Sequence, residues 1–280
     1  AAQATDAQRL SVEIPYFAPG LRVFQLPDWE TFPYDQISPH QDLVSDRLAT
    51  LYQLMQRAFD VVVVPVRTAL YRLAPAEYLA GRTFFLKQGD TLDLERLRSQ
   101  LTIAGYSHVT QVVAPGEYCV RGGLIDLYPM GSVVPYRIDL LDNEIETLRT
   151  FDVDTQRTIY KVSEVRLLPG REFPLDEDAR TFFRRRFRER VEGDPSKREI
   201  YKGIGRGATP AGIEYFLPLF FERTAVVTDY IPEGPLVCLH GDIAAATAQF
   251  WADTDSRYRL MRGDEDRPLL APAEPFLTQD

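Results

Sequence analysis

Four consecutive valines, Val61 to Val64, set the strongest constraint on how this chain folds. They stand between Asp60 and Pro65. A short, wholly apolar run bounded by turn residues is typical of a strand buried on both faces of a parallel sheet. Helical patterns are predicted on both sides, from residue 38 to 55 and over 68–73. Helix, buried strand and helix in succession indicate a parallel α/β domain.

The helix before the valines has a predicted start. Ser38 is expected to cap it, Pro39 suits its first position, and Gln41 completes a capping box. The apolar residues that follow at helical spacing are Val44, Leu48, Leu51 and Met55. Alternating residues over 21–26 predict a half-buried strand earlier in the chain.

The middle stretch, residues 82–169, has a different character. A helix is predicted over 92–104, with Leu94, Leu97 and Leu101 on one face and Gly105 as its stop. Strand-like runs follow at 116–128, 135–141, 144–151 and 162–168, with a turn at Asp142-Asn143. This stretch is therefore predicted to be a small, mainly antiparallel α+β domain.

The last stretch, residues 170–280, returns to helices and a buried strand. A helix is predicted over 175–191, with Phe183 and Phe187 on its apolar face, and a strand over 235–240. Asp242 is expected to cap a further helix. The order suggests one parallel α/β domain, formed by residues 1–81 and 170–280, that is split by the inserted domain 82–169.

Composition and charge exclude several classes of protein. The 280 residues carry a net charge of −9, which argues against a surface that neutralises nucleic-acid phosphates throughout. The two cysteines, Cys119 and Cys238, lie far apart and inside apolar patterns, so we expect core residues and a reduced, cytoplasmic compartment. No apolar run reaches the ~18–20 residues of a membrane span. Because the chain begins with Ala1 rather than Met, we expect a piece of a longer protein.

Motifs for catalysis and metal binding are not found. The sequence has no G-x-x-x-x-G-K-[ST] phosphate loop, and the glycines of 203–207 are interpreted as an ordinary loop. His40, His108 and His240 have no ligand spacing among themselves or with the cysteines. We therefore expect no metal, no cofactor and no catalytic residue.

Two charged patterns leave alternatives open. Five arginines between Arg184 and Arg190 form either a solvated helix face or a phosphate-contacting patch. On the strand 135–141, alternation places Arg137, Asp139 and Leu141 on one face, and Arg121 interrupts the apolar run before it. This face is either a protein-binding surface or an exposed polar strand face.

Several segments resemble a known family. The sequence is similar to the N-terminal region of the bacterial transcription-repair coupling factors, Mfd, over almost its whole length. The segments that carry the resemblance are residues 26–35, 38–42, 47–52, 116–129, 135–139, 210–215 and 267–270. That region is itself similar to UvrB, so the resemblance implies a degenerate helicase-like, P-loop NTPase-type α/β domain (1a and 1b) with domain 2 inserted.

The resemblance implies a binding function for domain 2. In both families this domain binds UvrA, the damage-recognition subunit of nucleotide excision repair. The positions that match the contacting ones are Arg121, Arg137, Asp139, Leu140, Leu141 and, at a neighbouring edge, His108. Charged positions would form bidentate pairs with UvrA and the apolar tip would fill a pocket. Cys119 and His108 stand where UvrB has arginines, and the two leucines where relatives often have phenylalanine.

Two differences from UvrB bear on catalysis. UvrB has a long, tyrosine-rich DNA-inserting hairpin where this chain has only Gln36-Ile37. UvrB has an Asp-Glu pair for Mg²⁺ and water at the position, called Walker B, that is matched here by His240 and Gly241. These residues cannot replace the carboxylates that ATP hydrolysis needs. The resemblance thus implies a non-catalytic recruitment module.

The rest of the parent protein is also implied by the resemblance. An ATP-driven DNA translocase and contacts with RNA polymerase and double-stranded DNA would lie beyond residue 280. The alternative reading is a UvrB-type ATPase fragment that engages damaged DNA directly.

Overall fold

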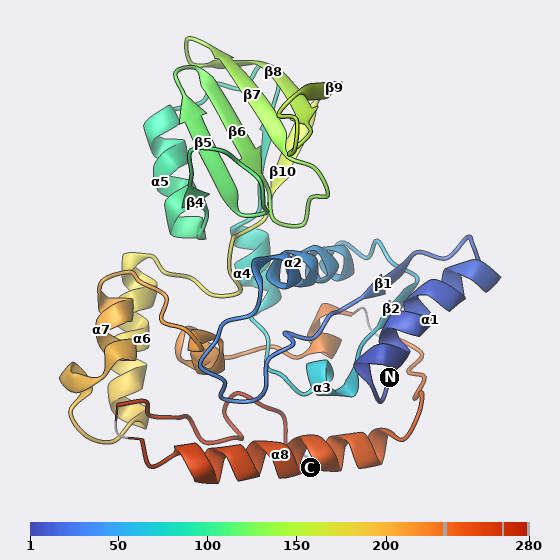
Figure 1. Cartoon of the computed structure of the whole chain (residues 1–280), viewed down its shortest axis with the longest axis vertical. Coiled ribbons are helices and arrows are strands. Elements are labelled where there is room, and N and C mark those ends of the chain that lie inside the picture. Colours follow the sequence, from blue (N-terminus) through green and yellow to red (C-terminus); the bar gives the residue numbers. More distant parts are fainter. Residues whose placement is uncertain (232–233, 265, 279–280) are drawn as a thin grey trace. The chain divides into compact units, whose positions relative to one another are not determined.

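The chain is mixed α/β and divides into two compact units (Figure 1). The computed structural model describes residues 1–231, 234–264 and 266–278. The first unit comprises residues 1–40, 50–76 and 173–280, and the second comprises 41–49 and 77–172. The division falls inside helix α2 (Gln41–Met55). In the described part of the chain, no helix is long and apolar enough to cross a membrane.

The first unit contains a small parallel sheet and most of the helices. Strand β1 (Val23–Gln25) pairs in parallel with β2 (Val61–Val63), and Val23 stands opposite Val61. The parallel strand predicted from the valine run is thus confirmed, but of its three residues only Val63 is buried. The other elements are α1 (Ala4–Phe17), α3 (Val66–Ala69), α6 (Glu177–Arg190), α7 (Glu199–Gly205) and α8 (Ile243–Met261), with 3₁₀ helices Pro195–Lys197, Ile213–Leu219 and Val227–Tyr230.

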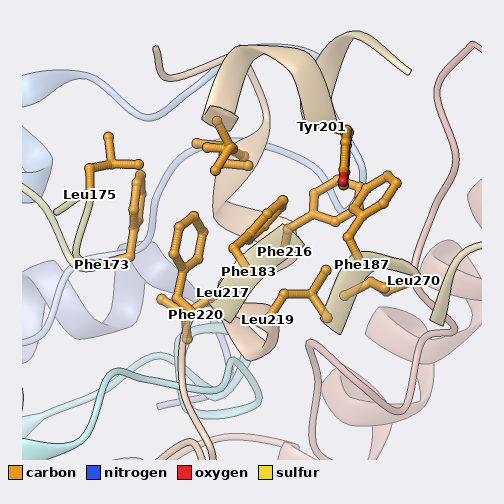
Figure 2. Packing of buried hydrophobic residues seen from close by; sticks show 12 residues of the cluster. Phe173, Leu175, Phe183, Phe187, Tyr201, Phe216, Leu217, Leu219, Phe220 and Leu270 are labelled. Atoms are coloured by element: carbon orange, nitrogen blue, oxygen red, sulfur yellow. The ribbon is translucent and has the colours of Figure 1, made fainter. Parts of the chain in front are cut away.

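Aromatic packing forms the core of the first unit (Figure 2). Phe183 and Phe187 of α6 are fully buried, as their spacing predicted. The ring of Phe220 lies 4.6 Å from that of Phe183 and stacks on Phe173 at 4.7 Å. A second cluster gathers Trp29, Tyr34, Tyr71, Tyr215, Phe250 and Phe276. Burying such rings supplies the main stabilisation of this unit.

The second unit is built on a six-stranded sheet. Its strand order is β4-β5-β6-β7-β8-β9, antiparallel except for the β4–β5 pair. The bounds are β4 Ser107–His108, β5 Glu117–Arg121, β6 Leu124–Tyr128, β7 Tyr136–Leu141, β8 Glu144–Phe151 and β9 Thr158–Val162. Strand β3 (Phe84–Lys87) pairs with β10 (Glu164–Leu167) in a separate two-stranded sheet. Helix α4 (Ala76–Gly81) precedes β3.

Helix α5 (Leu94–Ala104) follows its local sequence signals. The Asp93 carboxylate accepts a hydrogen bond from the Arg96 amide and caps the helix. Gly105 ends it with a left-handed φ of 100°, a conformation that glycine adopts without the cost of a Cβ. Leu97 and Leu101 are buried. The predicted helix is confirmed.

A buried ion pair joins two distant segments of the second unit. The Nε of Arg47 donates to Oε1 of Glu172 at 2.6 Å, and Nη2 donates to the other carboxylate oxygen at 3.2 Å. Both side chains are at most 5% exposed. A two-point pair of this kind fixes the relative orientation of residues 41–49 and the end of the second unit.

Two predicted elements differ in the structure, and one strand was not predicted. The run 116–128 is a hairpin of β5 and β6 that turns at Gly122-Gly123, where Gly122 has a φ of 61°. Strand β9 was not predicted. The helix predicted over 68–73 is the four-residue α3, which begins directly after Pro65 and ends at Ala69.

Ser38 does not cap α2, which begins at Gln41. The Ser38 hydroxyl instead donates to Glu214 and accepts a hydrogen bond from the Gly212 amide. The predicted cap is wrong because a hydroxyl with partners elsewhere in the fold is not available to the local helix end.

The strand predicted over 235–240 is also wrong. These residues form no strand, and Leu236, Val237 and Leu239 are 90%, 69% and 74% exposed. Cys238, predicted to be a core residue, is exposed, whereas Cys119 is buried as expected. The helix after Asp242 is confirmed, because the Asp242 carboxylate accepts a hydrogen bond from the Ala245 amide.

Candidate protein-binding face

The six-stranded sheet of the second unit has one apolar and one largely polar face. Ile125, Ile138 and Leu148 are paired across β6, β7 and β8 and are at most 1% exposed. Because side chains alternate along a strand, the neighbours of these residues lie on the other face. We call that surface the polar face and define it by Arg121, Asp126, Arg137, Asp139 and Arg149.

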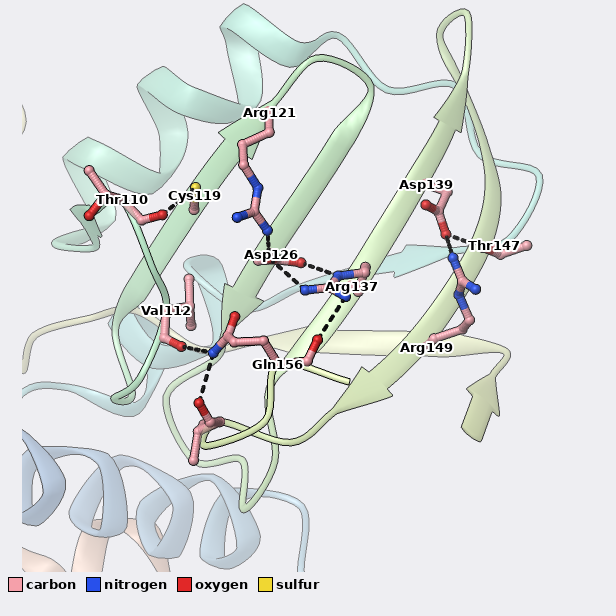
Figure 3. Close-up of polar contacts among 11 residues, drawn as sticks. Thr110, Val112, Cys119, Arg121, Asp126, Arg137, Asp139, Thr147, Arg149 and Gln156 are labelled. Atoms are coloured by element: carbon pink, nitrogen blue, oxygen red, sulfur yellow. Dashed lines mark hydrogen bonds and ion pairs between the residues drawn. The ribbon is translucent and has the colours of Figure 1, made fainter. Parts of the chain in front are cut away.

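Asp126 lies at the centre of the polar face (Figure 3). Its carboxylate accepts from Arg137 Nε at 2.7 Å and Nη2 at 3.0 Å, and from Arg121 Nη2 at 2.5 Å. The Asp126 side chain is 2% exposed. A buried carboxylate is costly unless charged donors satisfy it, and here two guanidinium groups do so.

Arg137 is held from several directions. Besides both bonds to Asp126, its Nη1 donates to the carbonyl of Gln156 at 3.1 Å. Its guanidinium lies over the Phe151 ring, 4.8 Å from the ring centre. The hydrogen bond to Asp126 raises the pKa of Arg137 further above its already high usual value. Arg137 is therefore a fixed positive charge with little freedom to move.

Arg121 is held more loosely. It makes one hydrogen bond to Asp126, and half of its side chain is exposed. A guanidinium has five N–H donors in a planar fork, so Arg121 retains donors that face solvent. This is the group on the polar face best able to pair with an acidic partner.

The second acidic residue of the face is also paired. Asp139 accepts hydrogen bonds from Arg149 on β8 and from the Thr147 hydroxyl, the latter at 2.5 Å (Figure 3). Three arginines and two aspartates thus leave the polar face with one positive charge in excess. The charges of Arg121 and Arg137 are already partly neutralised by Asp126. A carboxylate of a binding partner would have to share these guanidinium groups with Asp126.

The structure separates the two leucines of the predicted set. Alternation along β7 puts Leu141, which is 64% exposed, on the same face as Arg137 and Asp139. Leu140 pairs with the fully buried Ile145 and lies on the opposite face. The register shifts between Asp139 and Leu140, where Glu146 is an extra residue on β8, and the alternation along β7 is kept. Of these two leucines, it is therefore Leu141 that can supply an apolar contact beside the polar face.

His108 lies at the edge of the sheet. It is exposed on β4 and stands opposite Tyr118, with the ring centres 5.1 Å apart. Tyr118 is buried on the apolar face. His108 therefore lies beside the sheet and is not brought together with Arg121 and Arg137.

The residues at the predicted Walker B position lie in the first unit. The His240 carbonyl accepts from the Ala2 amide at 2.9 Å, and a His240 ring nitrogen lies 3.2 Å from Arg9. Gly241 has a φ of 82°, and a Cβ there would come within 2.8 Å of Ala2. Close packing against the start of the chain explains the glycine. The strand expected to lead into this pair is the one that does not form.

The central residue of the face was missed by sequence reasoning. Asp126 stands between apolar residues in Leu124-Ile-Asp-Leu-Tyr128. A carboxylate inside an apolar strand pattern is a signal, because buried charges are rarely left without partners. Arg149 was missed as well, since only strand pairing brings it beside Asp139.

A small apolar cluster lies on the same face of the sheet as the polar residues. Val112, Cys119 and Phe151 are buried together, and the Cys119 thiol donates to the carbonyl of Thr110 at 3.4 Å. This packing agrees with the prediction that Cys119 is a small core residue. Among the described residues, no group of three His, Cys, Asp or Glu side chains could hold a metal ion.

Comparisons with known proteins define the class of this domain. Residues 84–173, which include the whole six-stranded sheet, match the family described as "UvrB interaction domain". The chain is thus a mixed α/β module that contains a UvrB-type interaction domain.

Similar proteins extend the match to nearly the whole chain. It is 45% identical to the transcription-repair-coupling factor of Escherichia coli K12 over 98% of its own length and 24% of that protein. It is 44% identical to the Haemophilus influenzae factor over 91% of its own length and 22% of that protein. It is 29% identical to the Bacillus subtilis factor over 71% of its own length and 18% of that protein. The chain belongs to the transcription-repair coupling factor family and spans between about a fifth and a quarter of the length of these relatives.

Proposed function

We propose that this chain is a non-catalytic recruitment module that binds UvrA through the polar face of its second unit. The observation that supports this most strongly is the Asp126-centred arginine pair inside a matched UvrB interaction domain. By bringing UvrA to a coupling factor, the module would direct nucleotide excision repair to stalled RNA polymerase.

The geometry suggests different roles for the two arginines. Asp126, Phe151 and Gln156 fix Arg137, so this residue would present a charge already in position, at little entropic cost on binding. Arg121 would donate its solvent-facing N–H groups to a carboxylate of UvrA. Asp139 would accept from a basic partner residue, and Leu141 would fill an apolar pocket at the rim. Leu140 and His108 would act from the opposite face and the sheet edge.

The domain assignment follows the same proposal. We assign residues 1–81 and 170–280 to domains 1a and 1b of a degenerate helicase-like, P-loop NTPase-type fold, and 82–169 to domain 2. The parallel β1–β2 pair is compatible with this fold type. His240 and Gly241 are proposed to stand where a hydrolytic relative carries its acidic pair.

The properties of the whole protein are part of the proposal. Because the relatives are named as coupling factors of transcription and repair, we propose that the parent is a cytoplasmic, ATP-dependent DNA translocase. Its motor and its contacts with RNA polymerase and double-stranded DNA would lie outside residues 1–280. No cofactor is assigned to the chain itself.

Isothermal calorimetry with purified UvrA tests the recruitment function. We expect saturable binding with a fixed stoichiometry that weakens as salt rises, because charged pairs contribute to it. The absence of binding at low salt would refute the function.

An ATPase assay of the same preparation distinguishes the alternative, a UvrB-type ATPase fragment. We expect no ATP hydrolysis above background, with or without damaged DNA. Hydrolysis that damaged DNA stimulates would favour the alternative.

A further inference from the structure

The arginine-rich helix α6 has two groups of arginines with different surroundings. Three of them, at i, i+4 and i+8, are engaged with α7. Arg180 donates to the Gly205 carbonyl at 3.3 Å, Arg184 lies over the Tyr201 ring at 4.6 Å, and Arg188 donates to the Tyr201 hydroxyl at 3.4 Å. These three hold one helix against the other. Packing against α7 therefore explains this half of the basic run.

The remaining arginines are not explained in this way. Arg185 and Arg186 lie over the Phe182 ring at 5.0 and 5.8 Å, and within the described residues neither forms an ion pair. The Nε of Arg186 is buried and has no hydrogen-bond partner among the described residues. An unpaired donor leaves Arg186 able to bind an added acceptor, although the Nε atoms of six other described arginines share this feature, so the argument rests on what surrounds Arg186.

Arg186 lies at a cavity of about 330 Å³ that two other arginines also line. Arg72 comes from the segment after α3, and Arg223 from the loop after the 3₁₀ helix Ile213–Leu219. Arg223 makes no ion pair within the described part of the chain. Three arginines from three separate segments thus line one space, and Nη2 of Arg72 donates there to the Ala273 carbonyl at 3.5 Å.

Two carboxylates also line this cavity, Glu222 and Glu274. Glu274 is paired with Arg190 at 3.1 Å, so its charge is already balanced. With Arg190 counted, four arginines face two glutamates, and the site has an excess of two positive charges. This local excess stands out in a chain whose net charge is −9.

We propose that the cavity lined by Arg72, Arg186 and Arg223 binds a phosphate group. Planar guanidinium forks match the oxygen geometry of phosphate and can bind it at two points each. A phosphodiester of a DNA backbone and a free phosphate share this chemistry. The site is distinct from the polar face proposed for UvrA, so the two proposals can fail separately.

The test uses the full chain and two probes. A fluorescently labelled double-stranded DNA oligonucleotide is titrated at low salt and followed by anisotropy. Inorganic phosphate is titrated separately and followed by phosphorus NMR, against sodium chloride of equal ionic strength. The variant Arg186→Glu/Arg223→Glu is compared with Arg96→Glu/Arg98→Glu on α5, which changes the net charge equally.

We expect the cavity variant to weaken binding of at least one probe by about tenfold or more, and the α5 variant to change it by less than about twofold. Loss of DNA binding alone identifies the backbone phosphodiester, and loss of phosphate binding alone identifies a free phosphate. Circular dichroism and urea denaturation like those of the wild type confirm that the variants are folded. The proposal is overturned if wild-type protein binds neither probe, or if both variants weaken binding equally.

Discussion

At the scale of single residues, Asp126 determines how the polar face is organised. It is almost completely buried, and its two oxygens receive three N–H donors from Arg121 and Arg137. The same carboxylate therefore stabilises the sheet and orients the charges that we assign to UvrA binding. Asp126 thus combines a structural role with the proposed binding role, because it holds Arg137 by two hydrogen bonds and Arg121 by one.

The first prediction concerns this carboxylate. Asp126→Asn keeps the size of the side chain but leaves Arg137, only 14% exposed, without its counter-charge. We expect the free energy of unfolding to fall by about 2–4 kcal/mol in urea denaturation. Glu164→Gln is the control, because Glu164 pairs with Lys87 at an exposed site and should change stability by about 0–1 kcal/mol. Equal effects of the two variants would contradict the role of Asp126.

The second prediction concerns buried tyrosines at high pH. Burial raises the pKa of Tyr71 to about 12, whereas an unfolded tyrosine ionises near pH 10. The neutral phenol therefore stabilises the fold fully below about pH 10, and this contribution is lost as the pH rises toward 12. Burial also raises the pKa of Tyr34, Tyr106 and Tyr215.

The pH dependence of unfolding measures this effect. Between about pH 10 and 12, Tyr71→Phe should reduce the loss of stability by up to about 1.4 kcal/mol per pH unit. Tyr160→Phe, at a tyrosine that is 54% exposed, should leave the slope unchanged. An identical slope in wild type and Tyr71→Phe would show that Tyr71 ionises normally.

At the scale of helices and strands, the ends of elements are set by single backbone positions. Gly105 ends α5 with a φ of 100°, and a Cβ there would lie 2.7 Å from Cγ of Arg171. We expect Gly105→Ala to destabilise the second unit by about 1–2 kcal/mol, because an L-residue in this conformation is strained and the arginine must move.

Gly81 provides the matched comparison for this third prediction. It is the last residue of α4, has no left-handed φ and would place its Cβ in open space. Gly81→Ala should therefore be neutral or stabilise by up to about 1 kcal/mol in the same urea denaturation. A larger loss at Gly81 than at Gly105 would refute the assignment of the α5 cap.

Local signals explain which elements could be predicted from the sequence. Helices α5 and α6 carry their caps and apolar spacing within their own residues, and Asp93 and Asp176 do cap them. The run 235–240 is apolar too, but a strand needs a partner strand, and none pairs with it in the described residues. The hairpin at Gly122-Gly123 was missed although the Gly-Gly pair is a recognised turn signal.

The candidate site was predicted only in part for a similar reason. Resemblance pointed to Arg121, Arg137 and Asp139, and alternation correctly grouped Arg137 with Asp139. The partners of these residues, Asp126 and Arg149, depend on strand register, which residue spacing alone does not determine. For the same reason, the sequence did not reveal that Leu140 and Leu141 lie on opposite faces.

At the scale of the whole molecule, the chain distributes its chemistry between two units with separate cores. The second unit carries the polar face within the UvrB interaction domain. The first unit carries an aromatic core and the arginine-lined cavity. An acidic chain with two local basic sites is suited to specific contacts rather than general attraction to nucleic acid.

The affinity of the chain for UvrA, measured with variants of the polar face, tests the central claim most directly. We expect Arg121→Ala combined with Arg137→Ala to weaken binding by about tenfold or more, because both positions would be central to the interface. Lys87→Ala, at an exposed lysine of the separate β3–β10 sheet, should leave the affinity unchanged. Undiminished affinity in the double variant, with wild-type folding by circular dichroism, would contradict the claim that UvrA binds this face.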